Sequence, residues 1–152
     1  MKSFNFFKII FFILILSILN SCGLSNESEK DKLKICPQCK MPLPKSNINT
    51  TFLIKNDEIK YFDDIGCMIL WANDNHINLK NVKTKAFTTD TKRYMDVFNL
   101  YYSINENTPM HYGFGAYENK IKNSIDFNEV ILRMLRGENM ANPKIRKQIL
   151  GY

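Results

Sequence analysis

The amino-acid sequence predicts an α+β fold with a mainly antiparallel sheet and packed helices. A hairpin-like pair of strands comes first, and an amphipathic helical segment follows it. Another strand, further short strands and a second amphipathic helix come next, so the pattern has two similar halves. This order of elements is typical of an α+β domain.

The first 21 residues have the pattern of a secretory signal peptide. Lys2 and Lys8 flank a start that runs into an apolar segment, residues 9–19. This segment is short for a membrane span of about 20 residues but suits the central region of a signal. Leu19-Asn-Ser-Cys22 resembles the cleavage box of bacterial lipoproteins, which would make Cys22 the lipidated first residue of the mature chain. We prefer this interpretation to an ordinary signal peptide or a signal anchor because the cysteine comes just after the apolar run.

The remaining chain has the length of one domain preceded by a linker. Residues 22–34 are polar and without apolar periodicity, which predicts a flexible tether, and residues 35–152 form the expected domain. We therefore expect a lipid-anchored protein on the periplasmic or cell-surface side of a bacterial membrane. Loss of Lys2 and Lys8 leaves 19 of the 21 basic residues against 15 acidic ones. That excess is too mild and too dispersed to predict a nucleic-acid partner.

The cysteines of the mature chain indicate a soft-metal site. With Cys22 lipidated, Cys36, Cys39 and Cys67 remain, and an odd number in an oxidising compartment argues against a simple disulfide scaffold. The run Cys36-Pro-Gln-Cys39-Lys-Met41 places two thiols and a thioether within six residues. Thiolate with thioether is the ligand set that favours Cu(I) among the biological metals.

Two other interpretations of the C-x-x-C pair stay open at this point. The pair is also typical of half a zinc site, although a second pair of cysteines usually completes such a site. It is typical as well of a thioredoxin-like redox motif, which should follow a buried strand and open a helix. Pro42 and Pro44 follow the pair here, and prolines so placed block a long helix.

The first hairpin and helix have clear local signals. Residues 50–55 and 58–62 are rich in β-branched and aromatic side chains around the turn Asn56-Asp57. Asp63 or Asp64 can then cap a helix from about residue 65 to 71, or on to 73. The apolar face of that helix consists of Ile65, Met68, Ile69 and Ala72.

Cys67 lies off this apolar stripe, in the first turns of the helix. The helix dipole lowers the pKa of a thiol placed there, whereas the two neighbouring aspartates raise it. One interpretation makes Cys67 a third thiolate near the metal loop. The sequence favours the other, a small packing residue under the sheet, because free cysteine is commonly buried.

The second half is expected to carry a loop with further donors. Strands are predicted over residues 82–89, 100–104 and 112–117, with a turn at residues 90–92. Met110 follows Pro109 on a stiffened loop at a strand edge, which suits a metal ligand better than a core position does. His111 adds an imidazole beside it, and the other interpretation of both residues is a half-exposed loop pair.

Two helices are expected to end the chain. Asp126 and Glu129 form a capping-box-like start, and Gly137 ends the helix. A last helix is predicted to begin at Asn142-Pro143. The expected apolar stripe of the first of these helices is Phe127, Val130, Ile131, Met134 and Leu135.

Three segments carry a resemblance to a known family: Cys36-Pro-Gln-Cys-Lys-Met41, Tyr61-Phe-Asp-Asp-Ile-Gly-Cys-Met-Ile-Leu70 and Thr108-Pro-Met-His-Tyr-Gly-Phe-Gly-Ala-Tyr117. Together they resemble the NosL family, whose members are lipoproteins that act as copper chaperones in the maturation of nitrous oxide reductase. The resemblance covers residues 36 to about 135 and implies two related β-β-α-β units. Lys40 stands where the family usually has glycine, and no histidine- or methionine-rich tail follows the second helix.

The resemblance also implies a ligand set and a function. It implies Cu(I) binding through Cys36, Cys39 and Met110, with Met41, Cys67 and His111 as weaker candidates. We therefore expect a tethered, non-enzymatic protein that holds Cu(I) at an accessible site and passes it to a copper-receiving client enzyme or its assembly machinery. The alternatives are a periplasmic thiol-disulfide oxidoreductase that uses the C-x-x-C pair and a zinc-stabilised interaction lipoprotein.

Overall fold

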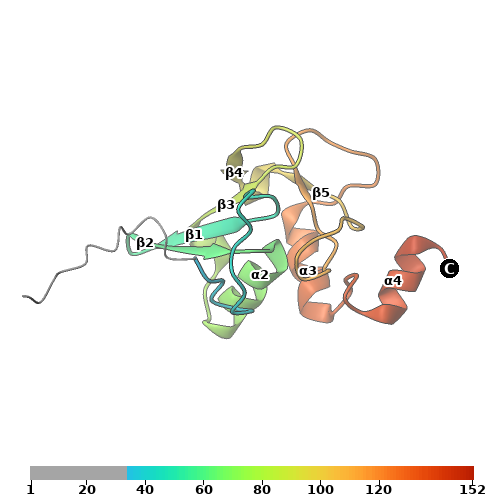
Figure 1. Cartoon of the computed structure of the whole chain (residues 1–152), viewed down its shortest axis with the longest axis horizontal. Helices are drawn as coiled ribbons and strands as arrows, with labels where there is room; N and C mark the ends of the chain where they lie inside the picture. Colours follow the sequence, from blue (N-terminus) through green and yellow to red (C-terminus); the bar gives the residue numbers. More distant parts are fainter. Residues whose placement is uncertain (1–33) are drawn as a thin grey trace, which may run out of the picture. The chain divides into compact units, whose positions relative to one another are not determined.

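The computed structural model describes residues 34–152 (Figure 1). The predicted signal peptide, the lipidation of Cys22 and nearly all of the predicted tether lie outside the described residues. In the described part of the chain, no helix is long and apolar enough to cross a membrane.

The predicted hairpin is present. Strands β1 (Thr51–Lys55) and β2 (Glu58–Phe62) pair antiparallel, with Thr51 opposite Phe62 and Lys55 opposite Glu58. The two turn residues, Asn56 and Asp57, have φ angles of 50° and 62°. Positive φ at both central residues is the geometry of the two-residue turns whose twist matches that of paired strands, and Asn and Asp tolerate it.

Four strands form the main sheet, in the order β2-β1-β3-β4, and every pairing is antiparallel. Strand β3 (Lys83–Phe87) lies within the strand predicted for residues 82–89 and pairs with β1. Strand β4 (Tyr94–Asp96) pairs with β3 and was not predicted. The structure therefore confirms an α+β fold with a mainly antiparallel sheet.

Helix α2 (Ile65–Asp74) packs against β1 and β2, and its predicted apolar face is buried. The Asp64 side chain caps it by accepting the Gly66 N–H at 2.9 Å. The helix runs three residues beyond Trp71, one residue further than the longer of the two predicted ends. Its capped N-terminus follows directly on β2, so this helix end is fixed next to the end of the hairpin.

The second half contains much shorter strands than the sequence predicted. Strands β5 (Tyr101–Tyr102) and β6 (Ala116–Tyr117) form a separate two-stranded sheet, and residues 103–104 and 112–115 lie outside it. The regular pairing of β5 with β6 ends at Gly115, because the Gly115 N–H donates to the Ser103 hydroxyl at 3.0 Å. In a regular ladder it would donate to a backbone carbonyl. The loop that carries Met110 is therefore held partly by side chains.

Helix α3 (Phe127–Arg136) follows, with Asp126 as its N-cap and Gly137 as its left-handed C-cap. Figure 1 shows α2 and α3 near one another, and the two helices are in contact. Phe127 is buried and its ring lies 5.0 Å from that of Phe98 and 5.7 Å from that of Tyr102, measured between centroids. Leu135, expected on the buried stripe, is instead 48% exposed.

The predicted last helix is present as α4 (Pro143–Leu150), and it buries none of its side chains.

The expected order β-β-α-β is present in the first half of the described chain, as β1-β2-α2-β3. The second half of the described chain runs β5-β6-α3-α4, with a helix in the place of the last strand. Short 3-10 turns, η1 (Leu79–Asn81) and η2 (Val97–Asn99), precede β3 and β5.

Candidate metal centre

The Cys36–Met41 segment folds into a tight loop that turns its two thiols to the same side. The Cys36 N–H donates to the Met41 carbonyl at 2.8 Å, and the Lys40 N–H donates to the Cys36 carbonyl at 3.0 Å. A bridge between Ile35 and Pro42 closes the base of the loop. Lys40 has a φ of 64°, a left-handed conformation that glycine adopts at lower cost.

The other half of the site comes from the end of the hairpin and the start of α2. Asp63 follows β2, and Cys67 lies in the first turn of α2, four residues further on. Because residues four apart around a helix start lie on one side, the Asp63 carboxylate and the Cys67 thiol can reach the same point.

These two segments meet in one cluster. The sulfur atoms of Cys36, Cys39 and Cys67 and a carboxylate oxygen of Asp63 all lie within 4.8 Å of one another, so the group could hold a metal ion. The Cys39 thiol donates to Asp63 Oδ2 at 3.2 Å, and the three cysteines are free thiols. Cys36, Cys67 and Asp63 are buried, whereas Cys39 is partly exposed. An ion would therefore reach the cluster from the Cys39 side.

The three thiols differ in their readiness to ionise. The Cys67 thiol donates to the sulfur of Cys36 and lowers the pKa of Cys36 to about 6; burial opposes this effect, and N–H groups of Cys39 and Asp63 support it. Burial raises the pKa of Cys39 to about 12. The pKa of Cys67 is raised, first because its thiol donates a hydrogen bond to the Cys36 sulfur and then because it is buried. Cys36 is thus the first thiolate that an arriving cation would meet in ionised form.

A second buried carboxylate connects the cluster to the Met110 loop. Burial raises the pKa of Asp64 to about 6, although the hydrogen bonds that its carboxylate accepts from N–H groups lower this pKa. One of these is the Met110 N–H, which donates to Asp64 Oδ2 at 3.3 Å. Met110 is half-buried and packs against the core, and burial also raises the pKa of the nearby Tyr112 to about 12, with the charges of Cys67 and Asp64 adding to the effect. The loop that carries Met110 is therefore fixed beside the start of α2.

Two of the weaker candidates, Met41 and His111, have exposed side chains. The side chain of Met41 is exposed, and the loop uses the Met41 backbone carbonyl instead. His111 is exposed and lines a separate cavity of about 130 Å³ together with Met140 and Arg146. In the described chain, His111 does not belong to the cluster of metal-ligating side chains.

Asp63 is the member of the cluster that the sequence analysis did not propose as a ligand. It was considered only as a helix cap and as a charge near Cys67. The signal that could have identified it is its spacing of four residues from Cys67 across the start of α2. Cys67 is buried, as the packing interpretation expects, and yet its sulfur faces the other two thiols.

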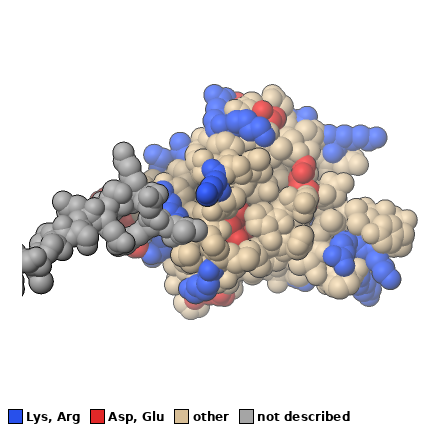
Figure 2. Space-filling model, in the orientation of Figure 1, with Lys and Arg blue, Asp and Glu red and all other residues tan. Residues whose placement is uncertain are grey.

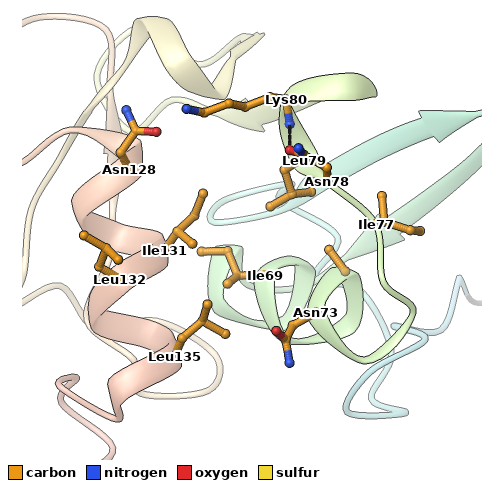
Figure 3. Close-up of a pocket in the computed structure, with 11 residues that line it drawn as sticks. Ile69, Asn73, Ile77, Asn78, Leu79, Lys80, Asn128, Ile131, Leu132 and Leu135 are labelled. Carbon is orange, nitrogen blue, oxygen red and sulfur yellow. Dashed lines mark hydrogen bonds between the residues drawn. The ribbon is translucent and has the colours of Figure 1, made fainter.

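A second hollow lies between α2 and α3 (Figure 3). It has a volume of about 370 Å³, and its walls are mostly apolar. Figure 3 shows Ile69 facing Ile131 across it, with Leu132 and Leu135 on the α3 side. Lys80 is the one charged residue among those that line it, so it contains no set of metal-ligating groups.

Basic residues are spread over the surface. Figure 2 shows Lys and Arg side chains in several separate groups on the visible face, with acidic side chains between them. One group lies toward the C-terminal end, where α4 carries Lys144, Arg146 and Lys147.

The fold and the site define an α+β protein with a Cys36-Cys39-Asp63-Cys67 cluster that could hold a metal ion. Comparisons of the chain with models of protein families, with curated proteins and with solved structures found no match.

Proposed function

We propose that the protein is a Cu(I)-binding metallochaperone of NosL type that hands copper to a client enzyme or to its assembly machinery. The observation that carries the proposal is the meeting of three thiols at a cluster with one partly exposed member. Thiolates are the ligands that select Cu(I), and two or three of them are sufficient for it. Nitrous oxide reductase is the client that the family resemblance implies.

The difference in exposure between the proposed ligands suits the transfer of a bound ion to a partner. Cys36 and Cys67 are fully buried and would hold the ion, whereas Cys39 lies at the surface of the cluster. An incoming ligand from a partner can replace an exposed thiolate before the buried ones release the ion. Met110 is the proposed thioether ligand, because the Met110 N–H bond to Asp64 keeps its loop beside the cluster.

The thiol-disulfide oxidoreductase alternative is less well supported. An attacking cysteine needs to be both ionised and accessible. Here the thiol with the lowered pKa, Cys36, is fully buried, and the accessible Cys39 has a pKa raised to about 12. We further propose that Cys22 carries the lipid that holds the protein on the periplasmic or cell-surface side of a bacterial membrane.

The test is a Cu(I) titration of the reduced full chain in mild detergent against a competing chromophoric chelator, with Met110→Ala and Cys39→Ser variants. Tight one-to-one binding that both substitutions weaken by at least about tenfold is expected. Met41→Ala is the matched control, because its exposed thioether should not contribute. Failure of the wild-type chain to compete for Cu(I) would refute the proposal.

A further inference from the structure

We propose that the same cluster has a second binding mode, for a divalent cation of the zinc class, in which Asp63 is the fourth ligand beside the thiolates of Cys36, Cys39 and Cys67. This inference rests on the metal binding of the proposed function but not on Cu(I) as the ion. It identifies the residue that would decide which class of metal the site accepts.

The environment of Asp63 points to a ligand rather than to a structural role. The residue is 1% exposed, and its Oδ2 accepts the Cys39 thiol. Its other oxygen, Oδ1, is buried and has no hydrogen-bond partner. The capping of α2 does not require it, because Asp64 performs that role. A buried carboxylate oxygen without a partner is unfavourable, and a cation in the cluster would supply the missing interaction.

The spacing of the four donors suits a tetrahedral ion. With metal–sulfur bonds of about 2.3 Å, the sulfur atoms of a tetrahedral zinc site lie roughly 3.8 Å apart. The four donor atoms here already lie within 4.8 Å of one another. A divalent ion would therefore need only small side-chain movements to close the site.

The chemistry of the donors separates the two binding modes. A divalent ion of the zinc class takes four ligands and accepts carboxylate oxygen together with thiolate. Cu(I) prefers sulfur, so a carboxylate contributes little to its binding. Asp63 should thus matter for the divalent ion alone, and the thioether of Met110 should matter for Cu(I) alone.

The experiment compares Asp63→Asn with Asp64→Asn in the full chain under a non-thiol reductant. Asparagine keeps the size of both side chains, and at position 64 it also keeps a good helix cap. Zn²⁺ affinity is measured by chelator competition, Cu(I) affinity as above, and Co²⁺ serves as the spectroscopic probe of geometry. Thermal unfolding of the metal-free variants verifies that each of them folds.

The expected result is that Asp63→Asn weakens Zn²⁺ binding by at least about tenfold and changes the Co²⁺ ligand-field bands. Its thiolate-to-cobalt charge-transfer bands should be retained, and its Cu(I) affinity should stay within about threefold of wild type. The Zn²⁺ affinity of Asp64→Asn should also stay within about threefold of wild type. Equal loss of Zn²⁺ and Cu(I) affinity, unchanged Zn²⁺ affinity, or no Zn²⁺ binding by the wild type would each overturn the inference. Binding of Zn²⁺ through Asp63 without any Cu(I) binding would support the inference and refute the copper-chaperone function.

Discussion

Replacement of Gly66 by alanine probes the contact between α2 and the Met110 loop. A Cβ atom at position 66 would lie 2.3 Å from Tyr112 Cδ2 and 2.8 Å from Met134 Cε. The Met134 methyl is the end of a flexible side chain and can move at low cost. The Tyr112 ring atom is close to its own backbone, so the ring and the loop behind it must shift.

Two opposing effects set the magnitude. Alanine in place of glycine favours a helix by up to about 1 kcal/mol, whereas forcing an extra carbon into a packed site costs about 1–3 kcal/mol. We expect Gly66→Ala to lower the free energy of unfolding by about 1–2 kcal/mol, which corresponds to a fall in Tm of roughly 4–8 °C for a domain of this size. Cu(I) affinity should also fall, because Met110 lies two residues from Tyr112.

The assay is a double-mutant cycle with Tyr112→Ala, followed by urea unfolding. Without the Tyr112 ring, Gly66→Ala should be neutral or slightly stabilising, so the two substitutions should show an interaction energy of about 1–3 kcal/mol. An equal loss of stability from Gly66→Ala in both backgrounds would refute the argument, since the ring would then not be the obstacle.

Two further predictions concern the loops. Lys40→Gly should raise the free energy of unfolding by up to about 1 kcal/mol, because Lys40 has a φ of 64°, and Lys40→Val should lower it; equal midpoints in urea would contradict this. Burial alone would raise the pKa of Asp90, but N–H groups of Asn119, Glu118 and Thr91 outweigh it and hold the value at about 2, below the ordinary 3.8. The folded state thus favours the ionised carboxylate, whose stabilising contribution is complete above about pH 4 and is lost as the pH falls toward 2. The free energy of unfolding of Asp90→Asn should therefore fall less than that of wild type between these two pH values. Equal falls for the two proteins in urea unfolding would contradict this role of the Asp90 carboxylate.

The elements that the sequence predicted well are those with local causes. The β1–β2 hairpin follows from Asn56-Asp57 between two β-rich runs, and the starts of α2 and α3 follow from the caps Asp64 and Asp126. Strand β4 has no such local signal. Its three residues are a strand because β3 pairs with them and because the ring of Tyr94 packs on that of Phe87 at 5.2 Å.

The part of the candidate site with a local sequence signal was predicted, and the part that depends on tertiary contacts was missed. The two thiols of the C-x-x-C pair were predicted because they lie only three positions apart in the chain. The role of Asp63 was missed because it depends on the placement of that loop against the end of β2, about 25 residues further along the chain. The strand length predicted for residues 112–117 was wrong because the hydroxyl of Ser103 replaces a backbone acceptor, and side-chain competition of this kind leaves no periodic signal.

The loop of Cys36 and the helix of Cys67 are joined by no covalent bond and lie about 30 residues apart in the chain. An ion held by both would act as a removable cross-link. Closing a loop of that length lowers the conformational entropy of the unfolded chain. This raises the free energy of the unfolded state by about 4 kcal/mol, as a disulfide does. A bound ion would thus hold the loop of Cys36 closed against α2, and its release would restore the freedom of that loop.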